Sequence, residues 1–350
     1  MFRYKQQTKI MKYNLLGNTG LLVSELCLGT MTFGGQDAGI WSSIGKLQQD
    51  EVNNLLRTAL DAGINFVDTA NVYSYGQSEE LLGRSLQQLG IKRDEIVIAT
   101  KVRGRMNEKP NSAGLSRYHI FNSVEQSLQR LQTGHIDLLY VHGVDLLTPV
   151  EEIMRALNDV VLSGKVRYIA VCNWPAWMVM KARGIAQANG WNNFIGLQYY
   201  YSVAGRDIER EILPLAKDQD LAVMPWSPLA GGFLSGKYTR GNTAGEDSRR
   251  LAFDFPPVNK EKAFDIIDVM AEIASEHGKT VAEVALAWVR QQPGITSTII
   301  GAKRPEQLQH NIRSTELELT AENLQRIAEI SALPAEYPGW MVERQTADRR

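Results

Sequence analysis

The sequence predicts a closed (β/α)8 barrel, and three observations carry that prediction: eight short apolar runs, helical segments between them, and the length of the chain. The chain has 350 residues, of which 44% are hydrophobic, so it can bury a large core. Strand-like runs that alternate with helical segments are typical of parallel strands joined by right-handed crossovers. Eight such units favour a closed barrel over an open sheet.

The predicted strands are nearly continuous in apolar residues, as strands buried on both faces should be. Residues 96–99 read Ile-Val-Ile-Ala, and residues 138–141 read Leu-Leu-Tyr-Val. In chain order the strands are Glu25–Thr30, Ile64–Thr69, Glu95–Lys101, Asp137–His142, Val166–Cys172, Phe194–Tyr199, Leu221–Trp226 and Ser297–Gly301.

Amphipathic segments lie between these strands. In Asp50–Ala62 the apolar residues recur at helical spacing on one face, and Phe121–Leu131 and Pro149–Leu162 behave in the same way. Glycines follow the predicted helix ends, where a positive φ is needed. They are Gly63, Gly90, Gly134, Gly164 and Gly190.

Further elements surround the barrel. Tyr13–Leu16 and Leu21–Val23 flank a glycine-containing turn and predict a β-hairpin that caps the bottom. A long loop rich in glycine and charge, residues 228–258, follows the seventh strand. Helices are predicted at Asn259–His277, Thr280–Gln291 and Thr320–Leu333, followed by a polar tail. We expect residues 1–11 to be a loose arm and residues 12–350 to form a single domain.

Composition excludes several classes of protein. With 38 Lys and Arg against 39 Asp and Glu, the net charge of −1 argues against a nucleic-acid-binding protein. Two cysteines, Cys27 and Cys172, cannot form a disulfide framework, which predicts a reducing, cytoplasmic location. The sequence contains no apolar run of about 18 residues, and residues 1–10 lack the apolar stretch of a signal peptide, so we expect no membrane association.

Reactive groups in this architecture lie at the carboxyl ends of the strands. Asp68, Lys101 and His142 end the second, third and fourth strands, and Tyr73 lies in the loop after Asp68. An ammonium beside a phenol lowers the phenol pKa from about 10, which would make Tyr73 a general acid. These groups supply a proton but no electrons, so a hydride-donating cofactor is implied. Taken singly, Asp68 could also be a helix N-cap, and Lys101 or His142 a solvated group.

Other motifs have alternative readings. Gly231–Lys237 matches the spacing of a P-loop, but Tyr238 stands where a magnesium-binding Ser or Thr is needed. The same glycines and Lys237 can still hold a phosphate. A GxGxxG dinucleotide motif is missing from the sequence, and its five histidines lack zinc-ligand spacing, so we expect no metal site.

The chain resembles the aldo-keto reductase family from Lys12 to about Leu333. The segments that carry this resemblance are Leu28–Gly34, Asn65–Ala70 with Tyr73 and Gly76–Glu79, Ile98–Lys101, Asp137–His142, Trp226–Gly232, Gly236–Tyr238 and Ile300–Leu308. The resemblance implies a barrel that binds NADP(H) across its mouth, with Tyr73 as the acid, Lys101 and Asp68 tuning it, and His142 orienting a carbonyl. It thus implies reduction of small aldehydes or ketones.

The resemblance also implies which residues bind the cofactor. Asn173 and Gln198 would hold the carboxamide, and Trp226 would stack on the nicotinamide. The implied cofactor-binding set is Thr30, Met31, Gln36, Asp68, Cys172, Asn173, Gln198, Trp226, Ser227, Pro228, Leu229, Gly231, Lys237, Gly301, Lys303, Arg304, Gln307, His310 and Asn311. Two positions depart from the family: Cys172 replaces a serine, and His310 replaces an acid near the adenine. Lys303 and Arg304 at a predicted helix start suit a 2′-phosphate, so we expect NADPH to be preferred.

Two other functions stay open. Potassium-channel β subunits share this style of sequence but have asparagine in place of the histidine, so His142 favours an enzyme over a regulatory subunit. A Schiff-base enzyme would need an uncharged Lys101, which Asp68 opposes. The protein could also be a homo-oligomer.

Substrate specificity is expected to come from loops at the mouth. The relevant segments are Gly34–Gly45, Val102–Ser116, Val144–Thr148 and Tyr337–Gln345. Trp41, Tyr75, Trp174 and Trp340 are candidate aromatic walls of the substrate pocket, with anchoring of loops as the alternative.

Overall fold

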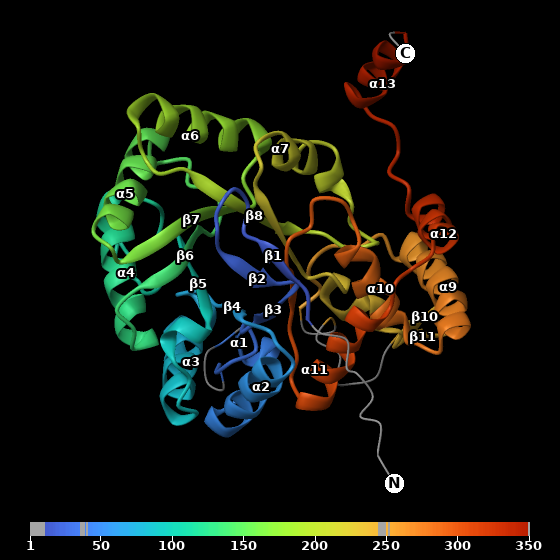
Figure 1. Ribbon diagram of the computed structural model, residues 1–350, viewed down its shortest axis with the longest axis horizontal. Coiled ribbons are helices and arrows are strands. Elements are labelled where there is room, and N and C mark those ends of the chain that lie inside the picture. The colour runs from blue at the N-terminus through green and yellow to red at the C-terminus, as the bar shows by residue number, and fades with distance from the viewer. Residues whose placement is uncertain (1–10, 36–38, 40, 244–249, 251–252, 349–350) are drawn as a thin grey trace.

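The predicted (β/α)8 barrel is confirmed by the computed structural model, which describes residues 11–35, 39, 41–243, 250 and 253–348. Eight strands form one sheet in the order β12-β3-β4-β5-β6-β7-β8-β9, and every neighbouring pair is parallel. The strands are β3 (Leu26–Gly29), β4 (Phe66–Asp68), β5 (Val97–Val102), β6 (Ile136–Val141), β7 (Val166–Cys172), β8 (Phe194–Tyr200), β9 (Ala222–Trp226) and β12 (Thr298–Ile300), shown in Figure 1.

The barrel is nearly closed where β9 approaches β12. The Thr296 amide donates a hydrogen bond of 2.9 Å to the carbonyl of Val223, just before β12 begins. A parallel bridge joins Val223 and Ile295 at the same place. The carboxyl ends of all eight strands therefore meet at one rim.

The strands are mostly apolar because they bury both faces. On β6, Leu138 and Tyr140 belong to the core inside the barrel, whereas Leu139 and Val141 pack with the core beneath the helices. This period of two explains the unbroken apolar runs in the sequence.

Helices surround the barrel. They are α2 (Gln49–Asp61), α3 (Gln77–Gln88), α4 (Arg117–Leu131), α5 (Val150–Leu162), α6 (Ala176–Asn189), α7 (Ile212–Asp218), α9 (Lys260–His277), α10 (Val281–Arg290), α11 (Pro305–Ile312) and α12 (Ala321–Ser331). Helix α4 begins four residues before its predicted start. Ser116 caps it there, and its hydroxyl accepts a hydrogen bond of 3.2 Å from the His119 amide.

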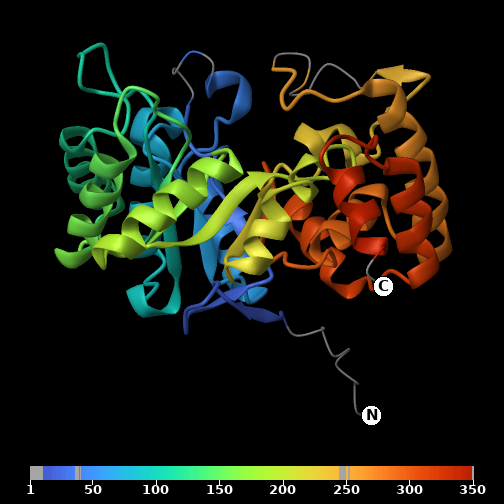
Figure 2. The same ribbon diagram turned by 90° about the horizontal axis from the view of Figure 1, so that it is seen from above.

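The predicted hairpin is formed by β1 (Tyr13–Leu15) and β2 (Leu22–Ser24), which pair antiparallel. Figure 2 shows it at one end of the barrel, opposite the long loops. Leu16 is fully buried in the interior core, and a Cβ on Gly17 would lie 2.4 Å from the Ile195 carbonyl oxygen. The hairpin therefore packs directly against the amino ends of the strands.

Two segments outside the barrel complete the molecule. After β9 come a 3-10 helix, η4 (Ala230–Ser235), and the short strands β10 (Tyr238–Thr239) and β11 (Asn242–Thr243). The tail, predicted only as polar, contains a helix, α13 (Gly339–Ala347), which projects away from the barrel and buries none of its residues (Figure 1). Within the described parts of the chain, no helix is both long and apolar enough to cross a membrane.

Candidate active site

A cavity of about 1410 Å³ opens at the carboxyl ends of the strands. It is larger than the roughly 300–1,000 Å³ common for small-molecule pockets. Most of the residues predicted from the sequence line it: Thr30, Met31, Asp68, Tyr73, His142, Asn173, Gln198, Trp226, Ser227, Pro228, Leu229, Gly231, Lys237, Gly301, Lys303, Arg304, Gln307 and Asn311.

Three predicted residues do not line the cavity, and one cannot be placed. Lys101 lies behind its wall with no exposed surface. Cys172 is fully buried in the interior core of the barrel, and His310 is exposed on α11, outside the lining. Gln36 falls outside the described residues.

A buried ion pair lies beneath the inner end of the cavity. The Lys101 ammonium, on β5, donates to a carboxylate oxygen of Asp68, on β4, and to the Thr69 carbonyl at 2.8 Å. Gln198 donates to the other carboxylate oxygen of Asp68 at 2.8 Å. Burial opposes the charge on Lys101, but Asp68 raises the pKa of the ammonium above its usual value. Lys101 therefore stays protonated at neutral pH.

Tyr73 lies over this ion pair. Its hydroxyl is 3.4 Å from Lys101 Nζ, and Nζ is 4.9 Å from the centre of the ring. Burial raises the pKa of Tyr73 above 10, and Lys101 only partly offsets that effect. The expected net lowering is therefore wrong, because removal of the phenolate from water outweighs the nearby cation. Tyr73 is a neutral phenol, able to donate a hydrogen bond or a proton.

His142 faces the phenol from the next strand end. The two rings are 5.9 Å apart at 76°. Burial, together with Lys101 and Arg103, lowers the pKa of His142 to about 3. A neutral imidazole and a neutral phenol thus share the inner end of the cavity, where both can donate to one oxygen atom.

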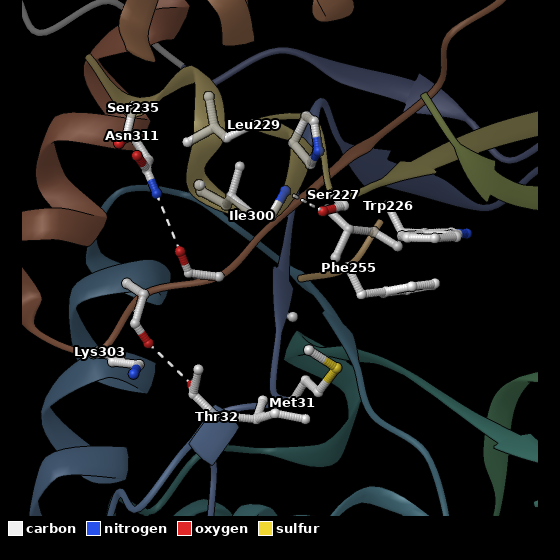
Figure 3. Close-up of a pocket in the computed structure, with 18 of the residues that line it drawn as sticks. Met31, Thr32, Trp226, Ser227, Leu229, Ser235, Phe255, Ile300, Lys303 and Asn311 are labelled. Atoms are coloured by element: carbon white, nitrogen blue, oxygen red, sulfur yellow. Dashed lines mark hydrogen bonds between the residues drawn. The ribbon is translucent and has the colours of Figure 1, made fainter. Parts of the chain in front are cut away.

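The opposite part of the cavity presents backbone groups and cations. Ser227, Ala230, Gly231 and Gly232 have φ values of 54°, 50°, 65° and 92°, an arrangement that turns successive amides into a concave loop. A Cβ on Gly232 would meet no atom within 4 Å, so this loop borders open space. The Asn311 side-chain amide donates a hydrogen bond of 3.2 Å to the Gly301 carbonyl, drawn as a dashed line in Figure 3. This bond holds Lys303 and the start of α11 beside the cavity.

The Trp226 ring packs against other aromatic residues. Phe255 stacks on it at 5.6 Å and 11°, as Figure 3 shows, and Tyr200 packs at 5.2 Å and 35°. Phe253 and Phe255 also line the cavity and were not predicted. The sequence signal available was two alternating phenylalanines in a segment otherwise dominated by charge and glycine.

The candidate aromatic walls behave differently from one another. Trp41, at the start of the short helix α1 (Trp41–Ile44), lines the cavity and packs 5.8 Å from Tyr73. Tyr75 contacts Trp41 but does not line the cavity. Trp174 is only 1% exposed and packs on Phe194, so its assignment as a wall is wrong and loop anchoring is its role. Trp340 lies on the projecting helix α13.

These features fit an extended anionic dinucleotide. One continuous lining includes both Tyr73 and Lys303. Along it lie cationic side chains and the backbone of Gly232, which faces open space. Among the described residues there is no group of three or more His, Cys, Asp or Glu side chains arranged to hold a metal ion.

Comparison with known proteins agrees with this geometry. The sequence model of the aldo/keto reductase family matches residues 25–332. The chain belongs to the aldo/keto reductase family. This aldo/keto reductase is 36% identical over 347 residues to the versiconal hemiacetal acetate reductase of Aspergillus parasiticus, covering 94% of this chain and 99% of the relative.

Other relatives of this aldo/keto reductase differ in their descriptions. The uncharacterized oxidoreductase YrpG of Bacillus subtilis is 38% identical, with 91% of this chain and 96% of the relative covered. A probable voltage-gated potassium channel subunit beta of Arabidopsis thaliana is 36% identical, with coverage of 88% and 92%. Both an oxidoreductase and a channel subunit are thus found among similar proteins.

Proposed function

We propose that this protein reduces aldehyde or ketone carbonyls to alcohols with NADP(H), using Tyr73 as the general acid. The observation that supports this most is the arrangement of Tyr73, His142 and the Lys101–Asp68 ion pair at one end of a long cavity. When bound, NADPH would supply the hydride that these side chains cannot.

The side chains have distinct tasks in this proposal. The imidazole of His142, uncharged at neutral pH, donates a hydrogen bond that fixes the carbonyl oxygen. Tyr73 then protonates that oxygen as negative charge develops on it. The Lys101 ammonium, 3.4 Å away, stabilises the phenolate that remains. Asp68 keeps Lys101 charged and in place.

The remainder of the cavity would hold the cofactor. Asn173 and Gln198 are the proposed partners of the carboxamide, and the Ser227–Lys237 segment of the pyrophosphate. Lys303 and Arg304 are proposed to bind the 2′-phosphate at the start of α11, which favours NADPH over NADH. Phe255 now covers part of Trp226, so stacking of Trp226 on the nicotinamide requires Phe255 to shift.

A panel of aldehydes and ketones, assayed by the loss of NADPH absorbance, tests the function. We expect turnover with NADPH and slower turnover with NADH. Lack of turnover with every carbonyl, despite cofactor binding, would instead support the second candidate, a regulatory subunit of the channel-β type. That candidate is favoured only by the similarity to channel subunits, and His142 argues against it.

Cellular context follows from the same proposal. We expect a cytoplasmic enzyme with a small carbonyl substrate and no nucleic-acid partner; both cysteines are free and buried, consistent with a reducing compartment. Analytical ultracentrifugation would establish whether it is a homo-oligomer.

A further inference from the structure

We infer, on the basis of the carbonyl reduction proposed above, that the preferred substrates carry an anionic group and that Arg103 binds it. Arg103 directly follows β5, two residues after Lys101, at the rim of the barrel. Its side chain is exposed beside the cavity and lies outside the lining itself.

The backbone of Arg103 is strained. Its φ is 148°, a value that favours glycine and is a marked outlier for a long side chain. Five other non-glycine residues with positive φ lie in the segments that follow strands on the same side of the barrel: Asn173 and Ser227 come directly after β7 and β9, and Ser74, Tyr75 and Ala230 lie in the loops beyond β4 and β9. Strained residues of this kind cluster at ligand-binding sites, where the surrounding structure holds them in place.

The guanidinium of Arg103 is fixed beside His142. Its Nε donates a hydrogen bond of 3.1 Å to the Val144 carbonyl, two residues beyond His142. The His142 amide in turn bonds to the Val102 carbonyl at 3.0 Å. This pair of contacts ties the ends of β5 and β6 together, and the charge of Arg103 contributes to the low pKa of His142.

The next residue joins this turn to the wall of the cavity. A Cβ on Gly104 would lie 2.7 Å from Cβ of Val72, which lines the cavity one residue before Tyr73. Arg103 is therefore anchored to the walls that hold both Tyr73 and His142.

The terminal nitrogens of Arg103 are available to a ligand. Neither Nη atom makes a hydrogen bond or ion pair with any residue that the structure describes. The nearby carboxylate of Asp145 is already engaged by the amides of Leu115 and Leu147 and the hydroxyl of Thr148. A free planar fork suits a carboxylate or phosphate held by two parallel bonds.

Matched substrates test this role. We would compare para-carboxybenzaldehyde and para-formylphenyl phosphate with the neutral para-nitrobenzaldehyde, and take the ratio of kcat/KM for each anionic aldehyde to that for the neutral one. The variants are Arg103→Gln and Arg103→Gly. Arg155→Gln, which removes an exposed arginine on α5, is the matched control for net charge. Ratios cancel any change common to all substrates.

We expect the ratio to fall by about tenfold or more in both Arg103 variants and to stay unchanged in Arg155→Gln. A fall for only one anionic aldehyde would identify that anion as the group recognised. Arg103→Gly should unfold at no lower temperature than wild type, because glycine adopts this φ freely, so at least one folded variant is available.

An unchanged ratio in a folded Arg103 variant, or a wild type that favours neutral aldehydes, would overturn the role of Arg103. If wild type reduced no carbonyl of any charge, the proposed function itself would fail, and the two failures are thus distinguishable.

Discussion

Lys101 Nζ lies 3.4 Å from the hydroxyl of Tyr73 while it is bonded to the carboxylate of Asp68. Lys101 has no exposed surface, so neither water nor salt screens this contact effectively. A neutral phenol is therefore held against a permanent positive charge. The arrangement stabilises the phenolate more than it changes the resting phenol.

Tyr73→Phe should lower the rate of carbonyl reduction by roughly 10²–10⁴-fold, since it removes the proton donor alone. Cofactor affinity, measured by fluorescence titration, should change little. Tyr75→Phe is a suitable control, because Tyr75 lies outside the cavity lining. Normal turnover in the Tyr73 variant would exclude the phenol from the reaction.

Lys101→Met should be nearly inactive and less stable by about 3–5 kcal/mol at neutral pH, because it leaves the Asp68 carboxylate buried without a countercharge, with the amide of Gln198 as its remaining side-chain partner. Burial already raises the pKa of Asp68 in the folded state, and loss of the ammonium that opposes this effect raises it further. The destabilisation is therefore absent below an unfolded pKa of about 3.9 and grows as the pH rises. Urea unfolding at several pH values measures it.

A double variant provides the control for that experiment. Adding Asp68→Asn to Lys101→Met removes the unpaired charge, so stability should recover while activity stays low. Recovery of activity as well would show that the ion pair serves only to hold the fold.

Stability should fall with acid because of His142. Folding lowers the pKa of His142 to about 3, against about 6.5 in the unfolded chain. The unfolded state takes up the proton first, so this contribution is complete above pH 6.5 and declines toward pH 3. His142→Gln should remove this change in stability, which amounts to about 5 kcal/mol for a pKa shift from about 6.5 to about 3. Replacement of the exposed His310 by Gln should leave the slope as it is.

The double change Lys303→Ala and Arg304→Ala should weaken NADPH binding at least tenfold more than NADH binding. Only NADPH has the extra phosphate, and each charge-assisted hydrogen bond contributes about 1.5–3 kcal/mol. Dissociation constants for both coenzymes in wild type and variant measure the effect. Equal losses, or a wild-type preference for NADH, would move the phosphate site elsewhere.

Tyr140→Phe should stabilise the protein by about 1 kcal/mol. The Tyr140 hydroxyl is buried inside the barrel and makes no hydrogen bond of normal geometry to a described residue, although the Gln198 side chain lies near it, so its removal ends a desolvation cost. Tyr199→Phe is the matched opposite, because the Tyr199 hydroxyl donates to the Trp174 carbonyl at 2.5 Å. The midpoint of thermal unfolding should rise in Tyr140→Phe and fall in Tyr199→Phe. A lower midpoint in Tyr140→Phe would reveal a hydrogen-bond partner for that hydroxyl.

The barrel was predictable because its strands are buried on both faces. The run Val166–Cys172 coincides with the observed strand, since its residues are buried and apolar apart from the exposed Arg167 and the half-buried Tyr168 near its start. Helix α13 could not be predicted, because it buries no apolar face and the apolar residues in its sequence show little helical periodicity. The start of α4 depended on a single cap at Ser116, which apolar spacing does not reveal.

The site was predictable where strand ends determine position. Asp68, Lys101 and His142 follow directly from the barrel, because neighbouring parallel strands deliver their last residues to one rim. The direction of the pKa shift of Tyr73 could not be predicted, since it depends on how deeply the phenol is buried. The stacking of Phe255 on Trp226 could not be predicted either, because Phe255 lies late in the long loop after β9 and sequence spacing does not say which residues that loop brings back to the cavity.

The hairpin of β1 and β2 makes the barrel a cup with one open end. Leu16 and the interior core fill the floor, so nothing passes through the barrel axis. Reactants and products therefore enter and leave at the mouth of the cavity on the carboxyl side, where Trp41 and Phe255 belong to the lining. Product must therefore leave through this mouth before the next substrate can bind. Where the chemical step is fast, product release then limits the rate of turnover.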